Sequence, residues 1–282
     1  MRANMWLTSP AKLNLFLHIT GRREDGYHTL QTIFQLLDYG DSLYFELRQQ
    51  GGIEVICKGL DISPQSNLVY RAARLLQERC KVAQGIHIQV DKRIPVGAGL
   101  GGGSSNAAAT LLALNQLWEL RLDASQLAGL GLELGADVPV FVHGHSAWGE
   151  GVGEQLTPLQ LPEQWYVVIA PSVEVSTTEV FSHQELTGDT APIKMAAFFE
   201  RGGVNDCQPV VRKLYPEVDK ALVWLEKHGQ ARMTGTGGCV FLPLPDPAQA
   251  EAVLAQKPAC WRGFLARGIN RSPVLENLEK PA

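Results

Sequence analysis

Residues 95–107 read Pro95-Val96-Gly97-Ala98-Gly99-Leu100-Gly101-Gly102-Gly103-Ser104-Ser105-Asn106-Ala107. Five glycines in this run let the backbone curl with its N–H groups turned inward. The alanine-rich stretch that follows predicts a helix, whose first turn has unpaired N–H donors and a partial positive charge. The run therefore predicts an anion site, most simply one for a phosphate.

A flexible linker is the simplest alternative for such a glycine-rich run. Residues 86–90 alternate before it as a strand does, and apolar residues recur at helical spacing over 111–118. Regular structure on both sides disfavours a linker. We therefore expect a strand, a phosphate-binding loop and a helix in succession.

Two known phosphate-loop patterns can be compared with this run. A P-loop needs a lysine where the chain has Gly103, so that interpretation fails. Gly97, Gly99 and Gly102 do satisfy G-x-G-x-x-G, the pattern of dinucleotide-binding folds. Those folds also place an acidic residue at a strand end about 20 residues further on, whereas the acids here fall around a predicted helix end. A nicotinamide-dependent oxidoreductase is therefore the weaker alternative.

Composition and charge narrow the class of protein. The 282 residues allow two domains, and 45% apolar with 19% charged residues is an ordinary globular mixture. The net charge of -4 argues against nucleic acid as the main partner. Local basic pairs remain at Arg22-Arg23 and Lys92-Arg93, and we expect the first pair to be solvated surface.

Cysteine and histidine spacing gives no metal site. The five cysteines are scattered and none stands in a C-x-x-C pattern, so neither a disulfide framework nor a zinc site is predicted. His143 and His145 lack an evident third ligand, and a solvent-facing loop is preferred. No stretch reads as a membrane span or an apolar leader, so we expect a cytoplasmic protein without a membrane partner. The sequence does not indicate an oligomeric state.

The first half of the chain is predicted to combine strands and helices. Residues 11–19 alternate, with Lys12 and Asn14 on a polar face opposite a core face. The other expected elements are strands at 30–37, 42–47 and 53–58 bounded by Asp25-Gly26, Gly40-Asp41 and Gly51-Gly52 turns, a helix from the cap Asn67 to about 81, a helix from the cap Ser125 to 135, and extended chain over 138–142.

A proline-punctuated stretch at 157–162 marks the predicted boundary between domains 1–158 and 159–282. Beyond it we expect a strand at 165–170, helices at 206–215, 216–228 and 247–256, and strands around the last helix. This order suits helices packed on one face of an antiparallel sheet. The glycine-rich stretch 234–238 is predicted as a hairpin between the central strands.

Three separated segments, 95–107, 135–141 and 234–238, together resemble the GHMP kinases, the superfamily of galactokinase, homoserine kinase, mevalonate kinase and phosphomevalonate kinase. Residues 10–17 and 23–32 are similar to one family within it, the cytidylyl methylerythritol kinases of the non-mevalonate isoprenoid pathway. The resemblance covers nearly the whole chain apart from 184–201. It implies an α+β, two-domain GHMP kinase fold, with an N-terminal, ATP-binding ribosomal-S5-domain-2-like domain and a C-terminal ferredoxin-like domain.

The same resemblance implies a reaction and a set of residues. ATP, with Mg²⁺, gives its γ-phosphoryl group to the 2-hydroxyl of a small-molecule substrate, the cytidine diphosphate-linked methylerythritol. Lys12 and Asp137 are the implied catalytic residues, with Asp137 as the base. Implied ATP contacts are Pro95, Val96, Gly97, Ala98, Gly99, Leu100, Gly101, Gly102, Gly103, Ser104 and Ser105, with Asn67 and Lys92 for the adenine. Implied substrate contacts are Asn14, Tyr27, His28 and Phe181.

Several of these residues also have an ordinary structural interpretation. An aspartate before Val-Pro is commonly a turn or a cap, Lys12 fits an exposed strand lysine, and Phe181 fits a core position. Asn67 equally fits a helix cap and Lys92 a surface charge. Either Ser104 or Ser105 can reach magnesium. Two further functions stay open: a GHMP kinase for another acceptor, such as homoserine or phosphomevalonate, and a nucleotide-binding module without catalysis.

Overall fold

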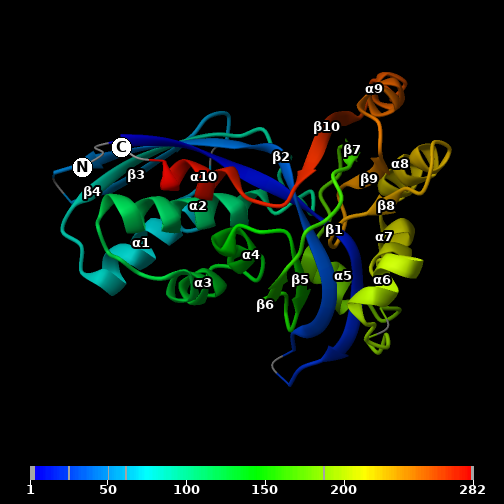
Figure 1. Cartoon of the computed structure of the whole chain (residues 1–282), viewed down its shortest axis with the longest axis horizontal. Coiled ribbons are helices and arrows are strands. Elements are labelled where there is room, and N and C mark those ends of the chain that lie inside the picture. The colour runs from blue at the N-terminus through cyan, green and yellow to red at the C-terminus, as the bar shows by residue number, and fades with distance from the viewer. Residues whose placement is uncertain (1–3, 25, 50, 61, 187, 281–282) are drawn as a thin grey trace.

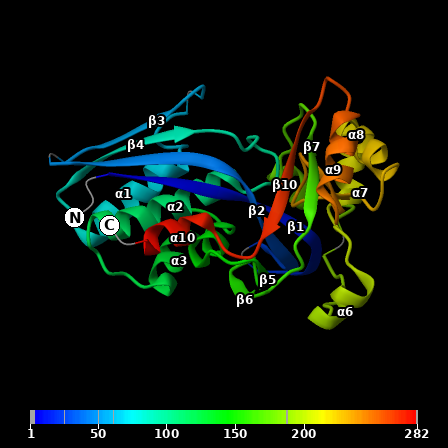
Figure 2. The ribbon, with the colours of Figure 1, turned by 45° about the horizontal axis from the view of Figure 1, so that its top comes forward.

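The computed structural model describes residues 4–24, 26–49, 51–60, 62–186 and 188–280, and within these ranges the chain forms two lobes. Figure 1 shows the first lobe around β1–β4 with α1–α4 and α10, and the second around β7–β10 with α5–α9. Figure 2, turned by 45°, shows β1 and β2 running from the first lobe toward the second. The two long strands thus connect the lobes.

The first lobe is built on a mixed sheet. β2 pairs antiparallel with β1, β4 and β5, and β4 pairs parallel with β3. A turn joins β1 to β2, in which Arg23 accepts a hydrogen bond from Gly26 N; Asp25 of the predicted Asp-Gly turn lies outside the described residues. The strands are β1 (Asn4–Arg22), β2 (His28–Arg48), β3 (Ile53–Cys57), β4 (Gly85–Asp91), β5 (Ala147–Glu150) and β6 (Gln155–Pro158).

Helices cover one face of this sheet and enclose the first core. Apolar residues of β2 and β4, such as Leu43 and Ile88, pack there against Leu76 of α1 and Leu111 of α2, all fully buried. Burial of this apolar surface is the main stabilising term for such a layer. The helices are α1 (Leu68–Cys80), α2 (Gly102–Leu117), α3 (Ala124–Leu132), α4 (Val138–His143) and the C-terminal α10 (Pro273–Glu279).

The second lobe is an antiparallel sheet in the order β10-β7-β9-β8. One face, with Val167 and Ile169, packs on helices through Leu222 and Ala250, as the sequence predicted. The strands are β7 (Trp165–Ala170), β8 (Arg232–Met233), β9 (Val240–Leu244) and β10 (Arg262–Ile269). The helices are α5 (Thr177–Ser182), α6 (Met195–Arg201), α7 (Gln208–Leu214), α8 (Pro216–Glu226) and α9 (Pro247–Ala255).

The opposite face of the second sheet meets the first lobe. Val168 and Phe241 pack there in one buried cluster with Leu13 of β1 and Leu100 of the glycine-rich run. β10 also pairs with β2, through Ile269 and Leu36. The predicted boundary at 158 and 159 falls at the end of β6 and stays a prediction, while α10, late in the sequence, lies against the first lobe (Figure 1).

The predicted turn at Gly40-Asp41 is wrong, because β2 runs through it without interruption. A Cβ on Gly40 would lie 2.3 Å from the carbonyl oxygen of Ser9, so the glycine permits close approach of two strands. Asp41 is fully buried, and its carboxylate accepts hydrogen bonds from the N–H groups of Arg93 and Ile94. Gly40 therefore has a packing role, and Asp41 holds the chain that enters the glycine-rich run.

The expectation of one polar and one core face on β1 is also incomplete. Lys12 and Asn14 are both 3% exposed, so the polar face is buried as well. The register with β2 shifts between Asn14 and Leu17, which breaks strict alternation. The polar face lies under a cavity between the lobes, where its side chains find partners.

Two local predictions in the first lobe are wrong. Residues 138–142 form the helix α4 instead of extended chain, since a short, fully buried apolar run does not distinguish the two and Pro139 fits a first helical turn. The cap of α3 is Asp123 in a capping box with Gln126, in place of Ser125. Asn67 does cap α1, as predicted.

Candidate active site

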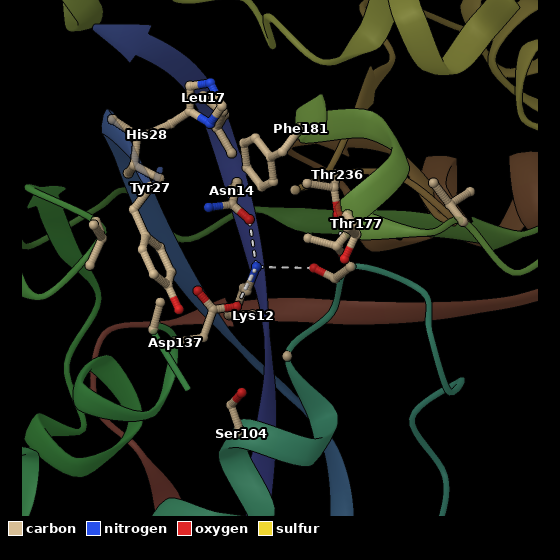
Figure 3. Close-up of a pocket in the computed structure, with 18 of the residues that line it drawn as sticks. Lys12, Asn14, Leu17, Tyr27, His28, Ser104, Asp137, Thr177, Phe181 and Thr236 are labelled. Atoms are coloured by element: carbon tan, nitrogen blue, oxygen red, sulfur yellow. Dashed lines mark hydrogen bonds and ion pairs between the residues drawn. The ribbon is translucent and has the colours of Figure 1, made fainter. Parts of the chain in front are cut away.

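A cavity of about 710 Å³ lies between the two lobes. Figure 3 shows the labelled side chains from β1, α2 and α5 converging on it around Lys12. The lining comes from the β1–β2 hairpin, the glycine-rich run, the start of α4, Val152 between β5 and β6, and the segments 175–182 and 235–236 of the second lobe. Segments remote in sequence thus form one site.

The glycine-rich run alternates between the cavity and the core. Gly97, Gly99 and Gly101 line the cavity, with φ angles of 67°, 74° and 71°. Ala98 and Leu100, between them, are buried in the cluster shared by the lobes. Positive φ at alternate positions is a conformation that glycine adopts without strain. The pattern explains why the glycines stand at every second residue.

The helix α2 starts within the glycine-rich run at the wall of the cavity. Its N-cap is Gly101, which offers no side chain to the first-turn N–H groups. Those donors and the positive end of the helix dipole suit an anion. Ser104 lines the cavity, whereas Ser105 is 1% exposed and its hydroxyl has no partner among the described residues. Ser104 is therefore the serine that a bound phosphate can reach.

Lys12 links three walls of the site through its ammonium group. It donates to the carbonyl oxygen of Gly99 at 3.0 Å and to Asn14 Oδ1 at 2.5 Å, and it lies 3.2 Å from Asp137 Oδ2. These contacts, drawn in Figure 3, fix the ammonium at the centre of the cavity. An exposed strand lysine is thereby excluded. Asp137 is at the N-cap position of α4 but makes no side-chain capping bond, so its carboxylate faces Lys12.

The 234–238 turn is both a hairpin and part of the cavity wall. It joins β8 to β9, and Gly235 and Thr236 line the cavity. A Cβ on Gly99 would lie 2.7 Å from the carbonyl oxygens of Thr234 and Gly237. The two glycine-rich turns therefore touch backbone to backbone across the lobes.

Aromatic side chains form the other end of the cavity. Tyr27, His28 and Phe181 all line it, and the rings of His28 and Phe181 stack with centroids 5.3 Å apart. Phe181 is half-buried, and it packs against the core of the second lobe while also lining the cavity. Burial, with the Arg22 charge as a second cause, lowers the pKa of His28 below its usual value. His28 is thus held neutral at pH 7 and can donate or accept hydrogen bonds.

Some predicted contacts do not line this cavity. The side-chain oxygen of Asn67 caps α1 by accepting a hydrogen bond from Val69 N, and Lys92 pairs with the buried carboxylate of Asp41. Lys92 is therefore no free surface charge. Within the glycine-rich run, several predicted contacts flank the lining positions and do not line the cavity themselves. They are Pro95, Val96, Ala98, Leu100, Gly102, Gly103 and Ser105.

Sequence reasoning missed several lining residues. The hydroxyls of Thr177 and Thr236 lie 2.9 Å apart and bridge α5 to the 234–238 turn. Arg22 also lines the cavity, although the sequence favoured solvated surface for it. The Thr236 position follows from the turn motif, and the Ser176-x-x-Glu179 pattern indicates the helix start that carries Thr177. No local pattern distinguishes Arg22 from an exposed charge.

Comparison with known proteins supports the class that this arrangement suggests. The model of the GHMP kinase N-terminal domain matches residues 67–145, and that of the C-terminal domain matches 190–262. A homoserine kinase structure from Cytophaga hutchinsonii has a TM-score of 0.71 over 96% of both chains at 16% identity, which shows the fold alone. The fold and site thus define an ATP-dependent small-molecule kinase of the GHMP class. An oxidoreductase finds no support.

More similar proteins narrow the class. A 4-diphosphocytidyl-2-C-methyl-D-erythritol kinase from Nitrosococcus oceani is 55% identical over 272 residues, 96% of this chain and 97% of that protein. A crystal structure of 4-(cytidine 5'-diphospho)-2C-methyl-D-erythritol kinase has a TM-score of 0.81 at 34% identity, covering 94% of this chain and 100% of that chain. The chain belongs to the 4-diphosphocytidyl-2-C-methyl-D-erythritol kinase family.

In the described part of the chain, no helix is both long and apolar enough to cross a membrane.

Proposed function

We propose that the chain transfers the γ-phosphoryl group of ATP to the 2-hydroxyl of 4-diphosphocytidyl-2-C-methyl-D-erythritol. The observation that carries this proposal is the Lys12–Asp137 pair, which lies between the glycine-rich run and an aromatic end of the same cavity. One end suits a triphosphate and the other a nucleotide base, with a carboxylate between them. This order matches a kinase whose acceptor is itself a nucleotide.

The ATP phosphates fit the glycine-rich end. The positive end of α2 and the backbone of residues 97–103 favour the β- and γ-phosphates, and the Ser104 hydroxyl offers a further hydrogen bond. Gly99 and Gly101 allow the close packing that holds the loop in this shape, because a side chain there would meet the backbone of the 234–238 turn or the ring of Phe141. Asn67 and Lys92 remain our proposed contacts for the adenine.

The oxygen groups at this end also suit Mg²⁺. The described residues contain no group of three or more His, Cys, Asp or Glu side chains placed to hold a metal. Magnesium bound with a nucleotide typically takes one or two protein oxygens and completes its shell with phosphates and water. Ser104 lines the cavity and supplies one such oxygen. When bound, the ion neutralises charge on the β- and γ-phosphates.

Asp137 is the proposed base. One carboxylate oxygen is held by Lys12, which leaves the other free to accept the proton of the substrate 2-hydroxyl. Lys12 orients the carboxylate, and its charge favours the approaching γ-phosphoryl group. Asn14 is tied to both Lys12 and Thr32, so its amide is fixed beside the acceptor site.

The aromatic end provides the proposed contacts for cytosine. Tyr27 is 63% exposed at the cavity mouth, where a stacking base would cover it. Phe181 offers a second ring, and neutral His28 can read a polar edge of the base. Homoserine and phosphomevalonate have no base to stack, so these side chains favour a nucleotide acceptor. We also keep the expectations of a cytoplasmic protein with no nucleic-acid partner.

Phosphorus NMR tests the proposal directly. The purified protein is incubated with Mg-ATP and the cytidylyl methylerythritol, and in parallel with homoserine. We expect ADP and a new phosphomonoester only with the cytidylyl substrate. A phosphorylated homoserine, or no transfer to the cytidylyl substrate, contradicts the proposed acceptor.

A further inference from the structure

A second cavity, of about 520 Å³, lies beside β1 and outside the site described above. Its lining includes Arg201 at the end of α6, Arg232 of β8 and His18 of β1. Leu17 lines the catalytic cavity and the next residue, His18, lines this one, so the two cavities lie on opposite sides of the strand. Figure 1 shows α6 and α7 beside this part of β1.

The charge of the lining is positive. Arg201 and Arg232 are both guanidinium groups, and no carboxylate lines the cavity in the part of the chain that the structure describes. The Asp206 carboxylate is nearby, but it accepts a hydrogen bond from Ile19 N at 2.7 Å and is not part of the lining. Arg232 is half-buried and Arg201 is exposed. A half-buried cation without an anionic partner has lost part of its hydration, and a bound anion offsets that loss.

The arginine geometry leaves donors for a ligand. Arg232 Nη1 donates to the carbonyl oxygen of Leu15 at 3.0 Å, which fixes the guanidinium on β1. Its other terminal nitrogen, Nη2, lies 3.4 Å from where a Cβ on Gly202 would stand, next to Arg201. A fixed guanidinium in a cavity that a second arginine also lines is an arrangement suited to the oxygens of a phosphate group.

His18 adds a neutral polar group. The residue is 6% exposed, its Nδ1 has no hydrogen-bond partner among the described residues, and its ring meets the edge of Phe16. A buried polar atom without a partner costs free energy in the folded state. The amide side chains of Gln208 and Gln230 also line the cavity. The site therefore offers hydrogen bonds as well as charge.

Apolar residues line the remaining wall. Ile193, Ala197 and Val204 belong to the lining as well as the polar groups. The volume exceeds that of a single phosphate group, so part of an occupant contacts hydrocarbon. The occupant favoured by this lining has an anionic head and a short apolar body.

Hydrogen bonds of one residue, Asn205, connect the linings of the two cavities. Asn205 lines the second cavity, and its side-chain amide donates to the carbonyl oxygens of Met233 and Gly235 at 3.0 and 2.8 Å. Gly235 lines the catalytic cavity. An occupant of the second cavity would therefore contact the residue that holds the 234–238 turn.

We propose that this second cavity binds a small phosphorylated molecule with a short apolar body, held by Arg201 and Arg232 at a site separate from the catalytic cavity. The proposal does not depend on which acceptor the kinase uses, because it concerns binding alone.

Isothermal titration calorimetry with n-butyl phosphate tests this site. The protein is first saturated with a non-hydrolysable ATP analogue and cytidine diphosphate, so that the catalytic cavity is filled. We expect one saturable site, no binding of n-butanol, and weaker binding of inorganic phosphate, which lacks the apolar body. Arg201→Gln is expected to weaken butyl phosphate binding by about 10- to 100-fold, because a charged hydrogen bond is lost.

Lys194→Gln is the matched control, since it removes one positive charge from the start of the same helix without touching the cavity. It is expected to bind like the unchanged protein. The proposal is overturned by absence of saturable binding, by equal weakening in the two variants, or by unchanged binding in Arg201→Gln. Each of these results leaves the phosphoryl-transfer assay unaffected, so the two proposals fail separately.

Discussion

Asp137 occupies a helix N-cap position, yet its carboxylate bonds to Lys12 and leaves the start of α4 without a side-chain cap. A cap would have contributed about 1 kcal/mol to the helix. The residue instead serves the cavity, where Lys12 also holds Asn14 and the glycine-rich run. Its function therefore depends on contacts with residues far away in sequence.

Replacing Asp137 by Asn removes the proposed base and keeps the size of the side chain. We expect turnover to fall by about 10²- to 10⁴-fold with little change in ATP affinity. Steady-state kinetics and ATP titration measure the two effects. Asp91→Asn, at the exposed end of β4, is the control, and an unchanged turnover number in Asp137→Asn would remove the base assignment.

Tyr27→Ala and Phe181→Ala test the aromatic end. Each is expected to raise the KM for the cytidylyl substrate by about 5- to 150-fold, because one stacking contact is lost. The KM for ATP should stay the same. Phe199→Ala, an exposed aromatic of α6 outside the cavity, is the control. Equal losses toward ATP would show that the rings are wrongly assigned.

At the scale of elements, the site depends on the contact between the glycine-rich run and the 234–238 turn. Each belongs to a different lobe, and the hydroxyl of Thr234 accepts a hydrogen bond from Asn14 N of β1. Backbone contact at this point requires glycine at position 99, where φ is positive and the carbonyls of the other turn are close. The phosphate end of the cavity is thus built by two turns together.

Gly99→Ala should disturb both turns. The added Cβ would stand 2.7 Å from two carbonyl oxygens, and an alanine at positive φ costs about 1–2 kcal/mol by itself. We expect a lower free energy of unfolding in urea and at least about a 10-fold higher KM for ATP. Gly129→Ala in α3, where nothing lies within 4 Å, is the control and should be neutral or slightly stabilising. Equal behaviour of the two variants would contradict the role of Gly99.

Local patterns predicted the elements that local chemistry controls. The strand, loop and helix over 85–117 and the Asn67 cap follow from alternation, glycine content and capping. The Gly40-Asp41 turn was wrong because strand packing, which is not local, places glycine there. α4 was missed because a buried apolar run lacks a period that separates helix from strand.

The candidate site was predictable to the extent that it carries motifs. Lys12, Asn14, Asp137 and the aromatic residues were named through the family resemblance and all line the cavity. The sequence favours solvated surface for Arg22 and gives no reason to single out Thr177, since an arginine at a strand end or a threonine at a helix start is common on any surface. Only the folding of the two lobes together gives them a place in the site.

On the scale of the whole molecule, the two lobes share a buried cluster and a strand pairing. Leu13 and Leu100 from the first lobe pack with Phe241 from the second, and β2 pairs with β10. The cavity lies beside this contact. Substitutions that destabilise the shared cluster are therefore expected to weaken ligand binding in the catalytic cavity as well.

Acid should destabilise the folded molecule through one buried and one half-buried histidine. Burial lowers the pKa of His18 and of His143 below the ordinary value of 6.5, so the unfolded chain binds protons more readily. The free energy of unfolding should therefore fall as pH is lowered through 6.5 toward the depressed values. Urea titrations at about pH 7.5 and about pH 5.5 measure this slope.

His18→Phe should flatten the pH dependence and cost little at neutral pH, because it keeps an aromatic ring and removes an unpartnered buried nitrogen. His183→Gln, a half-buried histidine that lines neither cavity, is the control. A slope that His18→Phe leaves unchanged would show that this histidine does not contribute to acid sensitivity.

A crystal structure with a non-hydrolysable ATP mimic and the cytidylyl substrate tests the catalytic arrangement most directly. We expect the triphosphate along residues 97–104, the cytosine against Tyr27 and Phe181, and the substrate 2-hydroxyl about 2.6–3.2 Å from the Asp137 carboxylate. A terminal phosphorus remote from Lys12 and Asp137, with the mimic bound elsewhere, would contradict phosphoryl transfer in this cavity.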